Sequence, residues 1–210
     1  VALGSIQGAK ILLTEDNKTN QLVATELLKD AGFIIEVATN GEEAVNMVKN
    51  SGVPSKYDLV LMDLQMPIMD GYKATETIRL MKEYNDLPIL AMTADVVTGV
   101  KEKCLSIGMM DFVMKPIIPD QLFNALIKWI KPGDREVVIK LEEDKEGKYI
   151  ELPEFKQINK EEGLRRVGGN ARLFKELLVR FRDRGEAPIH DILNEWPEGD
   201  MEVAIRLAHT

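Results

Sequence analysis

The chain has little of several features that often define a protein class. It contains one cysteine, Cys104, which excludes an internal disulfide, and its two histidines, His190 and His209, are too far apart for a zinc-type ligand pattern. No apolar run approaches the roughly 18 residues that cross a bilayer. The first residues also lack the charged-then-apolar order of a signal peptide. A reducing, cytosolic setting fits this composition, and Cys104 is expected to pack as a small apolar side chain.

The charge of the chain is spread out. Lys and Arg number 27 against 35 Asp and Glu, and no segment gathers basic residues onto one stripe, so direct nucleic-acid binding is not expected. Hydrophobic residues make up 45% of the 210 residues, enough for one medium domain and a smaller second one. Because the chain starts at Val1 and stops at Thr210 within a helical pattern, we interpret it as a piece of a longer protein.

Short apolar runs alternate with amphipathic segments from residue 10 to residue 131. This alternation predicts a βα repeat, that is, an α/β domain with a doubly wound, five-stranded parallel sheet covered by helices on both faces. The predicted strands are residues 10–14, 33–38, 59–62, 88–92 and 111–114. Residues 1–9 are interpreted as a leading linker.

The character of the sequence changes after residue 131. Pro132 and Gly133 break the last helix of the repeat, and dense mixed charge marks residues 132–152 as a linker. Residues 153–210 are predicted to be helical only, as an incomplete all-α bundle. Gly168 and Gly169 would end a short helix, Asn170 would cap the next one, and a last helix would begin near Gly199.

Polar side chains follow the predicted strands at one edge of the sheet. Glu15 and Asp16 come directly after the first strand, and Asp63 comes directly after the third. Ligands of doubly wound sheets bind at the carboxyl ends of the strands, so these three carboxylates should converge. Because they repel one another, a hard divalent cation with oxygen ligands, most simply Mg²⁺, is predicted among them.

Two further residues at the same edge extend this site. A carboxylate can attack phosphorus and form an aspartyl-phosphate, and catalysis of that step depends on positioning and charge neutralisation. Lys115, after the fifth strand, would supply a positive charge, and Thr93, after the fourth, a hydroxyl. Pro116 restricts the backbone of Lys115, and the peptide bond between them is open to the cis form.

The motifs I-L-L-T-E-D-N-K-T-N-Q-L-V-A, L-M-D-L-Q-M-P-I-M-D-G, M-T-A and K-P-I occur in that order within residues 10–131. This region resembles the receiver domain of two-component response regulators, in particular receivers fused to hybrid histidine kinases. The resemblance implies a flavodoxin-like fold and Asp63 as the phosphoacceptor. It further implies Mg²⁺ bound by Asp16, Asp63 and the backbone carbonyl of Gln65, with Glu15 assisting through water.

The same resemblance implies how the phosphoryl group is held and sensed. Thr93 and Lys115 would contact the phosphoryl group, and Thr93 would move together with the aromatic ring of Phe112. Phe112 lacks the phenol hydroxyl of some members, so an output that requires a Tyr hydroxyl is in doubt. Gln65 and Asp95 flank the site at positions where the family tunes the lifetime of the phosphate.

Residues 153–210 resemble the first half of a histidine phosphotransfer (HPt) domain, through G-L-R-R-V-G-G-N, L-F-K-E-L-L-V-R-F and A-I-R-L-A-H-T. On a helical wheel at about 100° per residue, His209 falls away from the apolar arc and faces solvent. An exposed imidazole is nucleophilic near neutral pH. The resemblance implies His209 as the phosphorylated histidine of a truncated domain, whereas His190 has no such context.

The resulting expectation is a phosphorelay fragment of a hybrid sensor histidine kinase. Phosphate would pass from phosphohistidine to Asp63 and be exchanged with His209; the receiver would catalyse its own phosphorylation, and no kinase core is present in this sequence. The expected partners are a histidine kinase core, of the same or another polypeptide, and a downstream response regulator. The expected location is cytoplasmic, alone or as the cytoplasmic part of a membrane-bound sensor, without membrane contact by this fragment.

Other interpretations stay open at this point. Taken singly, Asp63 would be a helix-capping acid, Thr93 a strand-end hydroxyl, and Lys115 and His209 ordinary surface residues. A phosphate hydrolase with Asp63 as nucleophile would need a general acid two residues later, which Gln65 cannot supply. A second alternative is a receiver-like interaction module that is never phosphorylated.

Overall fold

The computed structural model describes residues 3–94, 98–133, 135 and 159–180, which form two compact units. One unit is built on a β-sheet, and the described residues of the other are mainly helical. Several sequence predictions fall outside the described residues: the linker beyond Arg135, the helix near Gly199, and the residues Asp95, His190 and His209.

The first unit contains the predicted five-stranded parallel sheet, and this prediction is confirmed. Its strands are β1 (Lys10–Thr14), β2 (Ile34–Ala38), β3 (Leu59–Asp63), β4 (Ile89–Thr93) and β5 (Asp111–Met114). They lie in the order β2-β1-β3-β4-β5, with every pair parallel. This is the order of the flavodoxin-like doubly wound fold, whose binding edge lies at the carboxyl ends of the strands.

Two strands run one residue further than the sequence predicted. Asp63 pairs with Met92 and Thr93 pairs with Met114, so both functional candidates are strand residues rather than loop residues. The ladder continues beyond them, because Leu64 N donates to Met92 O at 3.2 Å and Lys115 N donates to Thr93 O at 2.7 Å. Backbone pairing on both sides therefore fixes the positions of Asp63 and Thr93.

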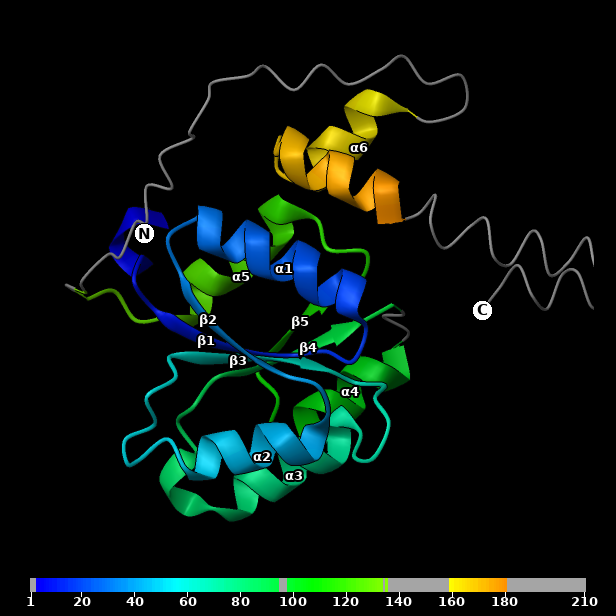
Figure 1. Ribbon diagram of the computed structural model, residues 1–210. Coiled ribbons are helices and arrows are strands. Elements are labelled where there is room, and N and C mark those ends of the chain that lie inside the picture. Colours follow the sequence, from blue (N-terminus) through cyan, green and yellow to red (C-terminus); the bar gives the residue numbers. More distant parts are fainter. Residues whose placement is uncertain (1–2, 95–97, 134, 136–158, 181–210) are drawn as a thin grey trace, which may run out of the picture. The chain divides into compact units, whose positions relative to one another are not determined.

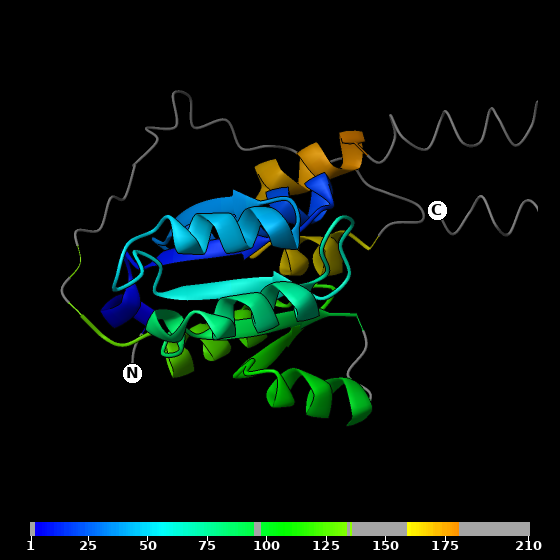
Figure 2. The ribbon, with the colours of Figure 1, turned by 90° about the horizontal axis from the view of Figure 1, so that it is seen from below.

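Helices cover both faces of the sheet (Figure 1). One face carries α1 (Lys18–Asp30), α5 (Pro119–Trp129) and the short 3-10 helix η1 (Leu3–Ile6). The other carries α2 (Gly41–Lys49), α3 (Gly71–Leu80) and α4 (Thr98–Ser106), with η2 (Lys82–Tyr84) after α3. Figure 2 shows α2 and α3 side by side on this second face.

The strands divide their side chains between two cores. Because successive residues of a strand point to opposite faces, Leu12, Val60 and Met62 belong to the core under α2 and α3. Ile11, Leu13 and their neighbours belong to the core under α1 and α5. Strands buried on both faces read as continuous apolar runs, which is why the sequence showed runs such as L-V-L-M without alternation.

Short polar residues start the helices. Asn17, Asn40 and Asp70 each accept a hydrogen bond from a backbone N–H of the helix that follows, at 2.9, 2.9 and 2.7 Å respectively. Between Asp16 and Asn17, which both stand before α1, the capping residue is therefore Asn17. Asp16 is left free for another role.

In the C-terminal part of the described chain, α6 (Lys160–Arg166) is followed by helical residues 171–180. Gly168 and Gly169 adopt left-handed φ values of 64° and 85°, and the Asn170 side chain accepts from Leu173 N at 2.9 Å. The predicted helix end and cap are thus confirmed. A Cβ atom on Gly163 would lie 2.4 Å from the Phe174 ring, so this glycine lets the two helical segments pack closely.

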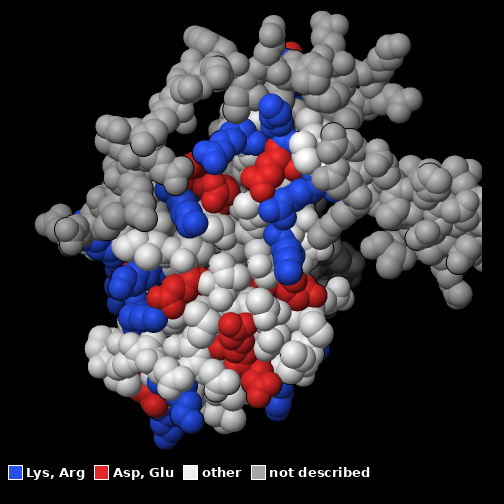
Figure 3. Space-filling model, in the orientation of Figure 1, with Lys and Arg blue, Asp and Glu red and all other residues white. Residues whose placement is uncertain are grey.

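The surface of the described residues is mixed in charge. On the face seen in Figure 3, acidic and basic side chains are interspersed rather than gathered into patches of one sign. None of the described helices has both the length and the apolar composition that a membrane span requires.

Candidate functional site

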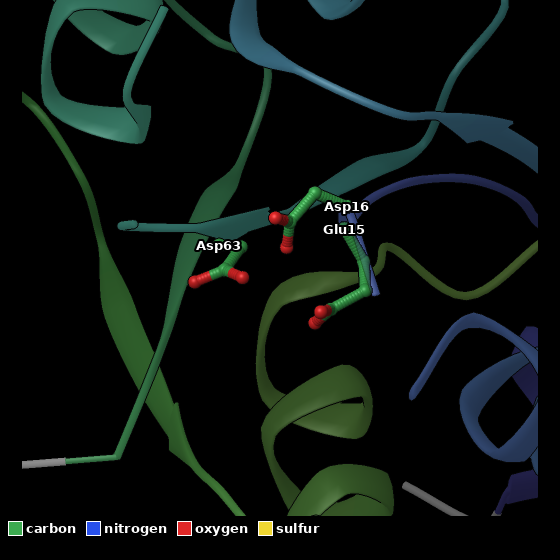
Figure 4. Close-up of side chains that lie close together, drawn as sticks. All are labelled: Glu15, Asp16 and Asp63. Carbon is green, nitrogen blue, oxygen red and sulfur yellow. The ribbon is translucent and has the colours of Figure 1, made fainter. Parts of the chain in front are cut away.

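Three carboxylates meet at the carboxyl edge of the sheet. Glu15 and Asp16 follow β1, and Asp63 ends the neighbouring strand β3. Each offers an oxygen that lies within 4.8 Å of the other two, and the three side chains point toward a common space (Figure 4). The predicted convergence of these residues is confirmed.

Lys115 closes one side of this cluster. Its Nζ atom lies 2.6 Å from Asp63 Oδ2 and 2.6 Å from Glu15 Oε2. Burial acts to lower the pKa of the Lys115 ammonium, but hydrogen bonds and charge attraction from Asp63 and Glu15 outweigh it, so the pKa of Lys115 is raised. A protonated lysine thus neutralises part of a nearly buried pair of acids.

The three acids differ in exposure. Glu15 and Asp63 keep only 1% and 5% of their surface in contact with solvent, whereas Asp16 is exposed. A ligand can therefore approach from the side of Asp16, while the other two carboxylates stay shielded. In such surroundings fixed charges act more strongly than in water.

Helix α1 fixes the orientation of Glu15. Its Oε1 atom accepts from Asn17 N at 3.2 Å and from Asn20 Nδ2 at 3.0 Å, while Gln21 Nε2 donates to the Glu15 carbonyl at 2.5 Å. No role was predicted for Asn20 or Gln21 from the sequence. Their spacing was an available signal, because the first turn of a helix that follows a strand can reach back to the strand end.

Asp63 is held by its own loop. Its Oδ1 atom accepts from Gln65 N at 3.1 Å. A Cβ atom on Gly71 would lie 2.1 Å from the Asp63 carbonyl oxygen, so only glycine permits the start of α3 to approach so closely. Asp63 therefore sits between a strand, a loop backbone and a helix start.

Thr93 and Lys115 are neighbours, as the sequence predicted. Thr93 is the last residue of β4, and the hydrogen bond from Lys115 N to Thr93 O brings the two backbones together. The Lys115–Pro116 peptide is cis. Phe112 in β5 is partly buried against the core under α2 and α3, and Lys101 Nζ lies 5.4 Å from its ring centroid.

The donor set suits a hard divalent cation. Carboxylate oxygens are the ligands that Mg²⁺ prefers, and three of them converge here without a thiolate or an imidazole in the same cluster of described residues. Cys104 lies elsewhere, buried, and burial raises the pKa of its thiol. The arrangement can hold a cation and present one carboxylate, Asp63, to a reacting group.

Residues 11–127, more than half of the chain, match the response regulator receiver domain family. The chain belongs to this family. Members act in two-component phosphorelay signalling and bind Mg²⁺ at an acidic site.

Two curated relatives place this receiver among those of sensor kinases. The chain is 45% identical over 130 residues to hybrid signal transduction histidine kinase B of Dictyostelium discoideum, covering 57% of this chain and 6% of the relative. It is 35% identical over 178 residues to the sensor protein GacS of Pseudomonas syringae pv. syringae, covering 83% of this chain and 19% of the relative. The chain thus spans less than a fifth of either protein.

Two solved structures share the fold. The receiver domain of the sensor histidine kinase PA1611 of Pseudomonas aeruginosa PAO1, with a magnesium ion in its active site cleft, is 37% identical with a TM-score of 0.53, covering 58% of this chain and 97% of that one. The receiver of Ssk1 from Saccharomyces cerevisiae, crystallised with the histidine phosphotransfer protein Ypd1, is 29% identical with a TM-score of 0.54, covering 59% and 90%.

Proposed function

We propose that Asp63 accepts a phosphoryl group from a phosphohistidine and that this step requires Mg²⁺. The observation that carries the proposal is the convergence of the Glu15, Asp16 and Asp63 carboxylates, with Lys115 bonded to Glu15 and Asp63. The cation would be held by Asp16, Asp63 and the Gln65 carbonyl, with Glu15 acting through water. When bound, it would neutralise charge on the incoming phosphate.

The chemistry of the transfer follows from the charges of the site. An oxygen of Asp63 attacks phosphorus and forms a new P–O bond, while the P–N bond to the donor histidine breaks and its electron pair returns to the imidazole. The negative charge of the group in transit is spread over its outer oxygens, so positively charged and hydrogen-bonding groups lower the barrier.

Lys115 has a specific task in this scheme. It now bonds to Asp63 Oδ2 and Glu15 Oε2, and attack by Asp63 requires that one of these contacts be exchanged for a phosphoryl oxygen. Glu15, held by Asn17 and Asn20, would keep the lysine in place during that exchange. The Thr93 hydroxyl would bind a second phosphoryl oxygen.

Thr93 and Phe112 would communicate the phosphorylated state. Inward movement of Thr93 would be accompanied by rotation of the Phe112 ring, which shifts the surface formed by the last two strands and helices. The partial burial of Phe112 at the edge of a core supports this role, because the ring has an inner side and a solvent side.

We further propose that residues 153–210 are the first part of an HPt domain whose His209 exchanges phosphate with an aspartate, and that the boundaries 10–131, 132–152 and 153–210 separate the receiver, a linker and this part. The helical segments on either side of Gly168 and Gly169 support this proposal, as does the alignment with GacS over 83% of the chain. A histidine kinase core and a downstream response regulator would be the partners, within a hybrid sensor kinase.

The test is phosphorylation by a small acyl phosphate donor. With Mg²⁺, the chain should gain the mass of one phosphoryl group in a base-labile form at Asp63, and Asp63→Asn should abolish this gain. Asp70→Asn is the matched control, because Asp70 ends the loop that follows Asp63 and caps α3, and asparagine caps equally well. An unmodified parent chain that still binds Mg²⁺ would favour the interaction-module alternative instead.

A further inference from the structure

Ile68 adopts a backbone conformation that its side chain disfavours. Its φ is 70°, and it is the only non-glycine residue with positive φ among the described residues. Met69 N donates to Pro67 O at 2.8 Å, so Ile68 is the central residue of a three-residue γ-turn. This form of the turn, with φ near about +75°, is rare and strained, and a β-branched side chain makes it worse.

The surrounding loop imposes this conformation. At one end Gln65 N bonds to Asp63 Oδ1, and at the other Gly71 N bonds to Leu64 O at 3.2 Å. In between, Met69 O accepts from Gly41 N at 3.0 Å, which ties the loop to the start of α2. The turn at position 68 is therefore set by the loop, whereas glycine or asparagine would adopt it at lower cost.

Folding offers no reason for isoleucine at this position. Its side chain is 78% exposed, whereas Met66 and Met69 of the same loop pack against the core under α2 and α3. An exposed apolar side chain on a strained backbone contributes nothing to the stability of the isolated domain. Such strain at a rim position points to a function that involves contact with another molecule.

The position of Ile68 indicates which molecule that is. Gln65, three residues earlier, donates its backbone N–H to Asp63 Oδ1, and Gly71, three residues later, touches the Asp63 carbonyl; three residues span at most about 11 Å. Ile68 thus stands at the rim of the acidic site. Any protein that brings a phosphohistidine into bonding distance of Asp63 must cover this rim, whereas a small phosphate donor need not.

We propose that Ile68 is a docking residue that determines specificity for helical proteins carrying the phosphorylated histidine. Its side chain would be buried in an apolar depression beside that histidine. The partner is thereby distinguished from a donor whose surface is polar at the same place. This inference rests on the proposed function, in which Asp63 takes phosphate from a histidine.

The test compares Ile68→Asn with Leu80→Asn. Leu80 is 81% exposed at the far end of α3, so it matches Ile68 in exposure but not in position or backbone strain. Phosphorylated Ypd1 serves as the protein donor and an acyl phosphate as the small donor. Ile68→Asn should slow transfer from Ypd1 about five- to tenfold through loss of apolar burial, yet leave the small-donor rate unchanged.

The thermal stability of Ile68→Asn should rise, although its rate of transfer from Ypd1 should fall. Because asparagine tolerates positive φ, Ile68→Asn should raise the Tm by roughly 3 to 6 °C, while Leu80→Asn should change neither Tm nor transfer rate appreciably. Ile68→Leu, which keeps an apolar side chain without β-branching, should retain most of the transfer from Ypd1. Faster unfolding together with slower transfer would indicate a merely structural role.

Three outcomes would overturn the inference. Transfer from Ypd1 could be equally fast in Ile68→Asn and the parent, it could fall equally in Leu80→Asn, or the parent could accept phosphate from the small donor but not from Ypd1. A parent chain that accepts phosphate from neither donor contradicts the proposed function itself. The two failures are thereby distinguishable.

Discussion

The two ends of the sheet each hold a partly buried cation, with different partners. At the amino ends of β4 and β5, the partners of the Arg79 guanidinium in the described part of the chain are backbone carbonyls. They belong to Gly108 (3.0 Å from Nε), Tyr84 (2.8 Å from Nη1) and Leu87 (2.8 Å from Nη2). At the carboxyl ends, Lys115 bonds to two carboxylates.

The different partners indicate a structural role for Arg79 and a chemical role for Lys115. Carbonyl dipoles are fixed by the backbone. Burial lowers the pKa of Arg79, although the charge of Asp86 acts to raise it, and the guanidinium stays charged and joins α3 to two loops. Carboxylates can exchange a lysine for a metal ion or a phosphoryl group. A lysine whose partners are carboxylates can therefore change its bonding partner during a reaction.

The largest expected effect of a substitution is on phosphorylation, at the carboxyl end of the sheet (the chemical end), where Lys115 lies. Lys115→Met should slow phosphorylation of Asp63 by a small donor about a hundredfold or more, because a positive charge near the transferring group is lost. Affinity for Mg²⁺ should rise, since Glu15 and Asp63 lose their competing partner. Acid-quenched time courses and titration calorimetry measure the two quantities.

Lys128→Met provides the control for this experiment. Lys128 also bonds to a carboxylate, Asp111, at 2.6 Å, but it lies on α5 and is 60% exposed. Both the rate and the Mg²⁺ affinity should stay at the parent values. If Lys115→Met lowered the metal affinity as well as the rate, Lys115 would be supporting the metal site rather than competing with it.

The next largest effect is on stability, at the amino end of the sheet (the structural end), where Arg79 lies. Arg79→Met should lower the free energy of unfolding by about 3 kcal/mol, because three carbonyls lose their donor. Urea denaturation measures it, and the phosphorylation rate of the remaining folded protein should be unchanged. A rate loss without a stability loss would mean that Arg79 acts on the phosphorylation site rather than on folding.

The sequence predicted the chemical end far better than the structural one. The site residues lie at the ends of apolar strand segments, and this pattern can be seen in the sequence itself: Glu15, Asp16, Asp63 and Lys115. The partners of Arg79 include a carbonyl 29 residues away in a loop, and a carbonyl is present at every position. No local pattern distinguishes those that accept from a guanidinium.

The backbone conformation of the loop after β3 could not be predicted from the sequence either. Gly71 is the glycine of the M-P-I-M-D-G motif, but it does not adopt a left-handed conformation. Glycine is instead required there by the close approach to Asp63, and the positive φ falls on Ile68. The reason is that tertiary contacts of the loop, such as Gly41 N to Met69 O, set the turn.

Two buried threonines differ in the hydrogen bonding of their hydroxyl groups. Thr14, at the carboxyl end of β1, is fully buried, and its hydroxyl has no hydrogen-bond partner among the residues that the structure describes. The buried Thr75 hydroxyl, in contrast, donates to Gly71 O at 2.8 Å. Thr14→Val should therefore raise the free energy of unfolding by about 1 kcal/mol, and Thr75→Val should lower it by about as much. Parallel urea denaturations would show the opposite signs. A loss of stability in Thr14→Val would assign its hydroxyl a partner, such as water.

The smallest effect concerns a carboxylate at the structural end. Asp111, the first residue of β5, accepts from Lys128 Nζ at 2.6 Å and Trp129 Nε1 at 2.8 Å. Burial acts to raise the pKa of Asp111, but hydrogen bonds from Lys128, Trp129 and Phe112 N, with the charge of Lys128, outweigh it, so this pKa is lowered. Unlike Asp63, Asp111 has partners that hold elements together.

The sign of the pH effect follows from linkage. A folded-state pKa below the unfolded value of 3.8 adds stability that is fully present above that pH and lost as the pH falls through the folded pKa. Because Lys128 is 60% exposed, the contribution should be only about 0.5 kcal/mol. Asp111→Asn should thus cost more stability at pH 6 than at pH 3, measured by urea unfolding, and Lys128→Met should remove much of that difference. A cost that grew on acidification would mean that Asp111 is stabilised in its protonated form rather than as a carboxylate.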